Sequence, residues 1–274
     1  MSKNISLVYM VAWMSSRFGW KIKQFAKVWP NWSTLMEYSL NQALKCDFSK
    51  IIFIVGKMTE IPFKEKFWNS YKWVPVYYAV QSFDDEKRDK PRWTVDALCS
   101  TKDLIDWSFI VCNWDDIYGE NSFKILFNHL IQSEDTASLW YILKNVLPEK
   151  WSTNRGIFKV DNNNYVKDIN EVIWIEKYKL SDFGLTDDSL CSMNIFGLTK
   201  DILTSLNKTL IQFKIEKQND RKSECYLPVE ISNIIKTEWK KMQLYSTPDK
   251  RLWITNPEDE DIVKEQIKEI EKNK

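Results

Sequence analysis

The sequence predicts an α/β protein in which a mixed, mainly parallel sheet lies between two layers of helices. Three apolar runs are long enough for strands buried on both faces, at 5–11, 51–55 and 109–112. Segments in which apolar residues recur at helical spacing alternate with them, at 34–44, 60–68 and 94–105. Because helical crossovers join parallel strands, this alternation predicts a three-layer α/β/α sandwich.

The other elements follow from local signals. Thr34 and Glu37 form a capping box, which places a helix start at Thr34. We expect further strands at 74–80, 136–143, 156–160, 165–172, 192–198 and 241–246. We expect further helices at 121–132, 200–211, 228–237 and from Asn256-Pro257 to the end. The charged segment 84–88 is predicted to be an exposed loop. Without a linker or repeat, residues 1–274 are expected to form one domain with halves at 1–145 and 146–274.

Composition excludes several classes of protein. The 39 Lys and Arg balance 38 Asp and Glu, which argues against a nucleic-acid or membrane-surface binder. No apolar run reaches the roughly 18 residues of a membrane span, and the N-terminus does not resemble a signal peptide. Five cysteines without a C-x-x-C pair suit buried, reduced thiols and a cytoplasmic location. With His129 as the single histidine, zinc sites and Ser-His-Asp catalysis are disfavoured.

Tryptophan and glycine occur in unusual numbers, 14 and 6. Average usage predicts about 19 glycines in a chain of this length, close to the two counts together. Several tryptophans also stand in turn-like contexts, for example Trp29, Trp32, Trp114 and Trp151. We hypothesise that most of them are glycines in a genetic code that reads UGA as glycine. The alternative is a protein rich in tryptophan, which would place that residue at the spacing of core positions.

Two strand ends carry residues suited to phosphate chemistry. The strand at 5–11 leads into small residues followed by Arg17, Lys21 and Lys23, a strand–loop–helix pattern that can hold a phosphate. Asp115 and Asp116 follow the strand at 109–112, where open sheets bind ligands and a carboxylate can hold Mg²⁺. An ordinary Asp-rich turn is the alternative for that pair. Phosphoryl or nucleotidyl transfer fits, because it requires no imidazole base.

With glycine at 13 and 20, segment 12–24 resembles the signature loop of sugar-1-phosphate nucleotidylyltransferases, within the nucleotidyltransferase family of Rossmann-like fold. Five further segments resemble family motifs in family order. They are Val28–Trp32 (V-G-P-N-G), Lys90–Ala97 (K-P-W-G-T-x-x-A), Asn113–Gly119 (N-A-D-D-x-Y-G), Ser192–Gly197 (S-M-N-x-W-G) and Asp249–Thr255 (D-K-W-x-G-V-T).

The resemblance implies an enzyme that joins an NTP to a sugar 1-phosphate, or a similar phosphomonoester, with Mg²⁺ and release of pyrophosphate. Residues 1–145 would bind the nucleotide and 146–274 the acceptor. The implied catalytic residues are Arg17 at the β- and γ-phosphates, Lys23 at the α-phosphate and Asp115 at the metal. Nucleotide-binding positions would be Ala12, Trp13, Met14, Ser16, Lys21, Gln81, Trp93, Thr94 and Asn113. Glu171 and Asn194 would contact the acceptor, and Asp249 would complete the metal site.

Tryptophan at these glycine positions would crowd the bound nucleotide, because glycine there allows close backbone approach or a positive φ. A chain that truly carries Trp13, Trp20, Trp93 and Trp114 would therefore be a non-catalytic nucleotide-binding protein. The other alternative is a phosphocholine-type cytidylyltransferase, which differs in the acceptor pocket. A glycosyltransferase of related fold also has paired Asp at a strand end, but the basic loop argues against it. The base, the acceptor and the oligomeric state stay open.

Overall fold

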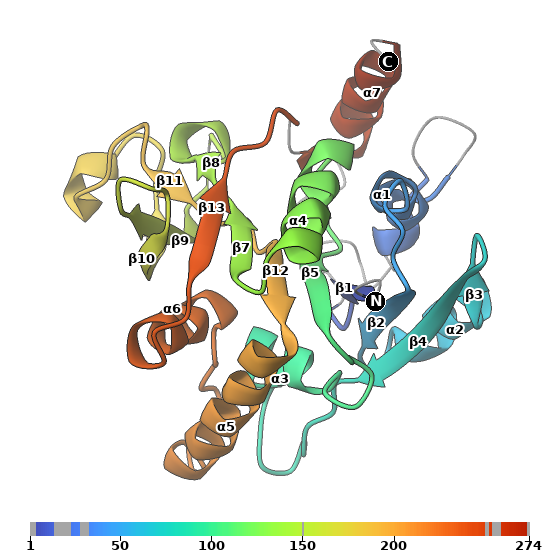
Figure 1. Ribbon diagram of the computed structural model, residues 1–274, viewed down its shortest axis with the longest axis horizontal. Coiled ribbons are helices and arrows are strands. Elements are labelled where there is room, and N and C mark those ends of the chain that lie inside the picture. The colour runs from blue at the N-terminus through green and yellow to red at the C-terminus, as the bar shows by residue number, and fades with distance from the viewer. Residues whose placement is uncertain are drawn as a thin grey trace.

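The computed structural model describes residues 4–13, 23–27, 33–149, 151–249, 252–253 and 259–272. Its centre is an eight-stranded sheet in the order β13-β7-β12-β5-β1-β2-β4-β3 (Figure 1). These strands are β1 (Ile5–Met10), β2 (Lys50–Val55), β3 (Ser70–Tyr71), β4 (Val74–Val80), β5 (Ser108–Asn113), β7 (Thr136–Leu139), β12 (Phe196–Thr199) and β13 (Met242–Tyr245). β12 runs antiparallel to β5 and β7, and β3 to β4, whereas all other neighbours are parallel. The mixed, mainly parallel sheet is confirmed.

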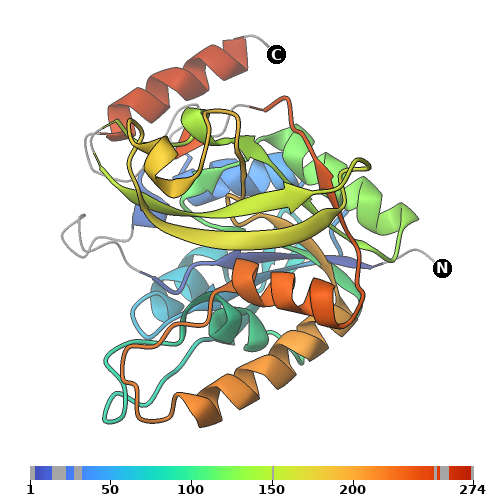
Figure 2. The ribbon, with the colours of Figure 1, turned by 90° about the vertical axis from the view of Figure 1, so that its left-hand side faces the viewer.

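Helices cover both faces of this sheet, as Figure 2 shows edge-on. One layer holds α1 (Leu35–Ala43), α2 (Glu60–Phe67) and α4 (Glu120–Gln132), and α7 (Asp259–Lys272) packs on the same side. The other holds α3 (Trp93–Cys99), α5 (Lys200–Glu216) and α6 (Leu227–Thr237). Alternate residues of β1 feed the two cores: Leu7 and Tyr9 belong to the first, and Val8 and Met10 to the second. The predicted three-layer sandwich is thus confirmed.

A second, four-stranded sheet flanks the first, in the order β10-β9-β11-β8. It contains β8 (Tyr141–Ile142), β9 (Thr153–Val160), β10 (Val166–Ile175) and β11 (Leu190–Cys191). β6 (Asp116–Ile117) and β14 (Leu252–Trp253) form a separate antiparallel pair. Short 3₁₀ turns occupy Lys23–Phe25, Leu143–Asn145 and Leu180–Phe183.

The capping box predicted at the start of α1 and the free cysteines predicted from the sequence are both confirmed. The Thr34 side chain accepts from the backbone N–H of Glu37, and the Glu37 carboxylate accepts from that of Thr34 at 2.8 Å. All five cysteines are free, four of them buried and Cys46 half-buried. None of the helices in the described ranges is long and apolar enough to cross a membrane.

Several predicted boundaries are wrong. The strand expected at 136–143 divides into β7 and β8, which belong to different sheets. The strand expected at 192–198 begins only at Phe196 and continues to Thr199, as β12. The helix expected at 94–105 ends at Cys99, because the hydroxyls of Ser100 and Thr101 donate back to the carbonyls of Ala97 and Leu98. Conversely, α5 continues beyond 211 to Glu216. The helix start expected at Asn256-Pro257 lies outside the described residues.

The segment 84–88 is exposed only as far as residue 87. Arg88 is 7% exposed, and its guanidinium donates to the carbonyls of Lys90, Asp220 and Ser223. These three acceptors satisfy a charge that would otherwise be costly to bury. The expectation of a fully exposed charged loop is therefore wrong at Arg88, which ties the connection before α3 to the connection before α6.

Candidate functional site

The carboxyl ends of the central parallel strands assemble most of the predicted site. β1 pairs with β5 so that Met10 lies opposite Asn113, and the turns that follow both strands therefore leave the same edge of the sheet. Gln81 continues β4 at this edge and donates its backbone N–H to the Val55 carbonyl at 2.8 Å. β12 enters antiparallel, with Phe196 opposite Val111, which brings the preceding Asn194 to the same edge. Open α/β sheets bind their ligands at this edge.

The start of the predicted phosphate loop lies against β2. A Cβ atom at Gly56 would be 2.7 Å from the carbonyl oxygen of Ala12, so only glycine allows the two backbones to come this close. The Gly56 N–H donates to Thr59 Oγ1 at 3.0 Å, which holds the turn that leads into α2. Gly56 was missed by sequence reasoning, although a lone glycine at a strand end is a signal of close backbone approach.

A buried glutamine holds the same backbone from the other direction. Gln24 is 0% exposed, and its Nε2 donates to the Trp13 carbonyl at 3.1 Å. Its Oε1 has no hydrogen-bond partner among the described residues. The sequence offered no signal for this role, because Gln24 follows the basic residues and reads as part of a solvated loop. The side chain of Lys23 lies outside the described part, as do Met14, Ser16, Arg17 and Lys21 in full.

Gln81 is a buried polar side chain at the same edge of the sheet. It is 4% exposed, and its Nε2 donates to the Trp93 carbonyl at 3.0 Å. Its Oε1 is buried without a hydrogen-bond partner among the described residues. Buried acceptors are normally satisfied, so an unsatisfied one at a candidate site suits a ligand that donates a hydrogen bond. Asp96, which lies next to Gln81, is held by an ion pair with Lys214 at 2.6 Å.

Two indoles meet beside Gln81. The ring centroids of Trp13 and Trp93 are 4.7 Å apart, and Trp93 has a positive φ of 71°. The neighbouring Thr94 uses its hydroxyl to accept the N–H of Leu227 at 2.9 Å, which caps α6. The structure therefore brings Trp13, Gln81 and Trp93 together, and it gives the Thr94 hydroxyl a partner within the protein.

The two adjacent aspartates at the end of β5 have different environments. Asp115 is half-buried, whereas Asp116 is 3% exposed and its Oδ2 lies 3.1 Å from the Tyr118 hydroxyl. That hydroxyl also accepts the Asn113 N–H at 3.3 Å and lies 2.7 Å from the Met193 carbonyl. Asp116 thus belongs to an internal network, and Asp115 is the more accessible carboxylate. Tyr118 lies within the segment that resembles N-A-D-D-x-Y-G, but its contact with the Met193 carbonyl had no signal in the sequence, because the two residues are far apart in the chain.

Asp249 lies at the N-terminus of α4. Its Oδ1 accepts from Asn121 Nδ2 at 2.9 Å and its Oδ2 from the Ser122 N–H at 3.0 Å. A carboxylate at this position satisfies free N–H groups and complements the helix dipole. Gly119 makes room for it, since a Cβ there would lie 2.3 Å from Asp249 Cγ. The metal role of Asp249 stays a prediction.

The described residues contain no group of three or more His, Cys, Asp and Glu side chains that could hold a metal ion. Mg²⁺ in nucleotide sites is usually held by one or two carboxylates together with the phosphates of the substrate. The half-buried carboxylate of Asp115, at the edge reached by the loop after β1, has the donor chemistry that such an ion needs. Asp115 therefore fits the predicted metal.

The predicted acceptor residues lie together on the second half of the chain. Glu171 pairs with Gly156 across β10 and β9, and the Gly156 carbonyl accepts the N–H of Ser192 at 2.8 Å. Ser192 Oγ in turn accepts the N–H of Asn194 at 3.1 Å. Burial raises the pKa of Glu171, and the nearby charge of Arg155 partly opposes this shift. The turn at Met193 joins this group to the predicted nucleotide site through the Tyr118 hydroxyl.

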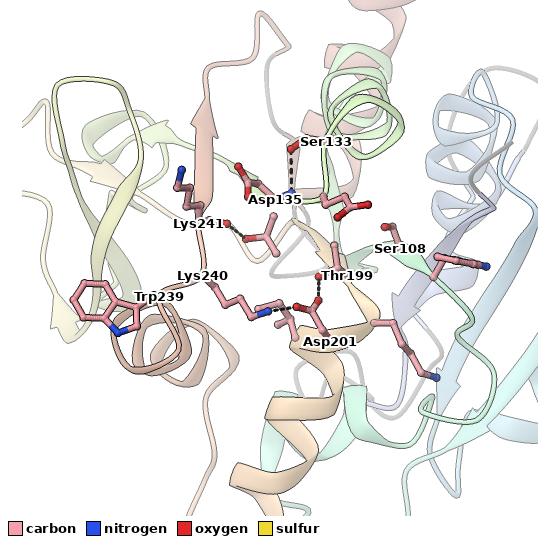
Figure 3. A pocket seen from close by; sticks show the side chains of 13 residues that line it. Ser108, Ser133, Asp135, Thr199, Asp201, Trp239, Lys240 and Lys241 are labelled. Carbon is pink, nitrogen blue, oxygen red and sulfur yellow. Dashed lines mark hydrogen bonds and ion pairs between the residues drawn. The ribbon is translucent and has the colours of Figure 1, made fainter. Parts of the chain in front are cut away.

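A cavity of about 460 Å³ lies at the opposite edge of the sheet (Figure 3). It is lined by residues at the start of β5, β7 and β13 and at the end of β12, among them Ser108, Thr136, Thr199 and Lys241. Lys240 and Asp201 form an ion pair within it. Because it opens at the amino ends of the parallel strands, it is separate from the predicted nucleotide site.

The sequence matches no family model, and no curated protein matches it at a significant level. Solved structures do share the fold. The proposed glucose-1-phosphate thymidylyltransferase of Bacillus anthracis superposes with a TM-score of 0.71 at 13% identity, over 96% of this chain and 95% of that one. The inositol-1-phosphate CTP transferase of T. maritima gives 0.66 at 12%, over 98% of each chain.

A third similar structure is the UTP-bound UGPase of Acinetobacter baumannii, with a TM-score of 0.65 at 14% identity over 97% of this chain and 93% of that one. In all three cases the alignment covers nearly the whole chain. The fold is therefore the Rossmann-like fold of the nucleotidyltransferases, as the sequence motifs predicted.

Proposed function

We propose that this protein is a nucleotidyltransferase that joins an NTP to a sugar 1-phosphate, or a similar phosphomonoester, and releases pyrophosphate. The observation that carries the proposal is the register of β1 with β5. It brings the loop after Met10 and the carboxylate of Asp115 to one edge of a nucleotidyltransferase fold. The names of similar structures, an inositol-1-phosphate CTP transferase and a UTP-bound UGPase, support the same class of substrates.

In the proposed reaction, an oxygen of the acceptor phosphomonoester attacks the α-phosphorus of the NTP. A new P–O bond forms while the bond from the α-phosphorus to the bridging oxygen breaks, and pyrophosphate leaves with that electron pair. The attacking oxygen is already ionised at neutral pH, so no side chain has to remove a proton. A chain with His129 as its one histidine suits this chemistry.

The proposed roles divide between the two halves. Arg17 and Lys23 neutralise the phosphates, with the loop of Ala12, Trp13, Met14, Ser16 and Lys21 around them. Magnesium held at Asp115, with Asp249 as the proposed second ligand, would neutralise charge on the triphosphate. The buried, unsatisfied oxygen of Gln81 reads the base edge, and Trp93, Thr94 and Asn113 line the nucleoside. Glu171 and Asn194 bind the acceptor. The free cysteines favour work in the reducing cytoplasm.

The experiment is a matrix of each NTP with each of three acceptors, namely glucose 1-phosphate, inositol 1-phosphate and phosphocholine, with Mg²⁺ present. In a variant with glycine at 13, 20, 93 and 114, we expect pyrophosphate release that requires both an NTP and a 1-phosphate. Release with CTP and phosphocholine alone would favour the cytidylyltransferase alternative. Nucleotide binding without release under any combination would favour the non-catalytic alternative.

A matched pair of variants links the activity to this edge of the sheet. Asp115→Asn should lower turnover by about 10²–10³-fold, the usual loss when an electrostatic group of an active site is removed. Asp106→Asn makes the same change at the opposite edge, where Asp106 is exposed and paired with Lys50, and should leave turnover unchanged. Equal rates in Asp115→Asn and the parent protein would contradict the role of Asp115.

A further inference from the structure

We infer that five positions of this chain are glycine in the protein as its own cell makes it: Trp68, Trp73, Trp93, Trp174 and Trp239. Eight non-glycine residues of the described chain have positive φ, and these five are among them, at 42° to 71°. For bulky residues a positive φ is a rare outlier, whereas glycine adopts it at no steric cost. The inference rests on backbone geometry and stands without the proposed function.

Trp73 lies in a turn that nearly always requires glycine. Tyr71 of β3 pairs directly with Val74 of β4, which leaves Lys72 and Trp73 as a two-residue hairpin loop. Both have positive φ, 47° and 71°, as in a type I′ turn, whose usual sequence is Asn-Gly. The Trp73 side chain is 98% exposed, so no packing offsets the strain of its backbone.

Trp68 and Trp239 stand just beyond helix ends, where glycine is the commonest residue. Trp68 directly follows α2 with φ 42° and ψ −126°, a combination close to that of the first central residue of a type II′ turn. Trp239 follows the C-cap residue of α6 with φ 55°, the left-handed position of a helix C-terminus. Their side chains are 75% and 89% exposed, and Figure 3 shows Trp239 turned away from the other labelled side chains.

Trp174 lies at an irregularity in β10. The register between β10 and β9 shifts between Val172 and Ile175, and Trp174 has φ 61° within this bulge. A bulge residue in the left-handed region is typically glycine. The Trp174 side chain is 68% exposed. Trp93 completes the set at the start of α3, where its indole lies against Trp13 beside Gln81. Glycine at 93 would remove that indole from the predicted base site.

Independent backbone contexts thus converge on one residue type: a hairpin turn, two helix ends, a strand bulge and a helix start. Four of the five side chains are more than two thirds exposed, which is unusual for tryptophan. The simplest cause is the codon UGA. The cell would read it as glycine, whereas the printed sequence has tryptophan at these positions. The written glycines Gly119 and Gly184 have positive φ as well.

The decisive experiment is peptide sequencing by mass spectrometry of the protein purified from the organism that carries the gene. We expect glycine at 68, 73, 93, 174 and 239, and UGA at the corresponding codons. Tryptophan in these peptides, or UGG at these codons, overturns the inference. This experiment measures residue identity and not activity, so its outcome is independent of whether the proposed function is correct.

A second measurement tests the geometry in recombinant protein. At position 73 we expect Trp73→Gly to be more stable than Trp73→Ala, by about 5- to 30-fold in the unfolding equilibrium constant. Trp107 is the control, since it is 64% exposed and has no positive φ. There Trp107→Ala should be more stable than Trp107→Gly, by about 2- to 5-fold. Equal or greater stability of Trp73→Ala over Trp73→Gly would contradict the left-handed turn and the inference.

Discussion

The two sides of the candidate site are built in different ways. The proposed nucleotide side is formed by the ends of β1, β2 and β5, whose residues are almost entirely buried. Parallel strands flank β1 and β2 on both sides, and β5 lies between the parallel β1 and the antiparallel β12. The proposed acceptor side is formed by β10 and the turn before β12, with register shifts in β10 and several exposed positions. A reaction step common to all substrates requires fixed geometry, whereas the recognition of varied acceptors tolerates an adaptable surface.

The largest effect is expected where the nucleotide side is tightest. Gly56→Ala would place a Cβ 2.7 Å from the Ala12 carbonyl oxygen, a backbone atom that cannot move alone. We expect a loss of about 3 kcal/mol in the free energy of unfolding, the upper end for overpacking. Gly156→Ala, the same change on the acceptor side, meets side-chain atoms at 3.1 and 3.3 Å and should cost about half as much or less. Urea unfolding measures the stability of both variants. Equal losses would contradict the difference in packing between the two sides.

Tyr118→Phe tests the hydroxyl that joins the two sides. Its loss leaves the buried Met193 carbonyl and Asn113 N–H without this partner, which should cost about 2 kcal/mol. Tyr178→Phe is the control, because its hydroxyl bonds Glu149 at the surface and should change stability by less than about 0.5 kcal/mol. If both variants unfold at the same urea concentration, the hydroxyl does not couple the two sides.

Asp249→Ala removes the carboxylate at the start of α4. We expect a loss of about 1 kcal/mol, because the Asn121 amide and the Ser122 N–H lose their acceptor. Asp188→Ala changes an aspartate whose side chain is 81% exposed and should have little effect. Thermal unfolding of the two variants compares them. An unchanged melting temperature in Asp249→Ala would argue that the capping contact contributes nothing.

The smallest effect concerns the pH dependence of stability. Burial holds the pKa of Glu171 above its ordinary value of 4.5, so the folded state disfavours the charged form. This penalty is absent in acid and develops as the pH rises through 4.5 and the higher folded pKa. Glu171→Gln should therefore gain stability relative to the parent protein as the pH rises from about 4 to about 7.

The pKa of Glu149 is shifted in the opposite direction to that of Glu171. Hydrogen bonds from Lys177 and Tyr178 lower the pKa of Glu149. Its contribution to stability is therefore present at pH values above its ordinary pKa and is lost as the pH falls. Glu149→Gln should thus lose stability relative to the parent protein as the pH rises. Parallel pH profiles for the two variants would contradict the assigned environment of Glu171.

The elements that the sequence predicts well are those set by local signals. The runs at 51–55 and 109–112 are buried strands because they are apolar throughout, and the capping box fixes the start of α1 from Thr34 and Glu37 alone. The insertion of β12 between β5 and β7 could not be predicted, since it depends on partners far away in the chain. The burial of Arg88 has the same origin, because two of its three acceptors, the carbonyls of Asp220 and Ser223, come from the connection before α6.

The residues of the candidate site also divide into those with local signals in the sequence and those that depend on distant contacts. Asp115 could be predicted because it follows a strand at the ligand-binding edge of a parallel sheet, whereas Gln81 was implied by the family resemblance. Gly56, Gln24 and Tyr118 were missed, since each acts on backbone atoms that become neighbours only in the folded chain. Asp249 was assigned to a metal, and its contacts with the first turn of α4 were not foreseen for the same reason.

The pairing of β14 with β6 determines when the molecule can be finished during synthesis. β6 leaves the ribosome early, directly after β5, but the neighbour of Asp116 is Trp253, which is made after all eight strands of the central sheet. The start of α4 waits equally long for Asp249. Domains generally fold as units, so this edge cannot close before residues 249 and 253 have emerged. The edge that we propose for catalysis is thus among the last parts to close.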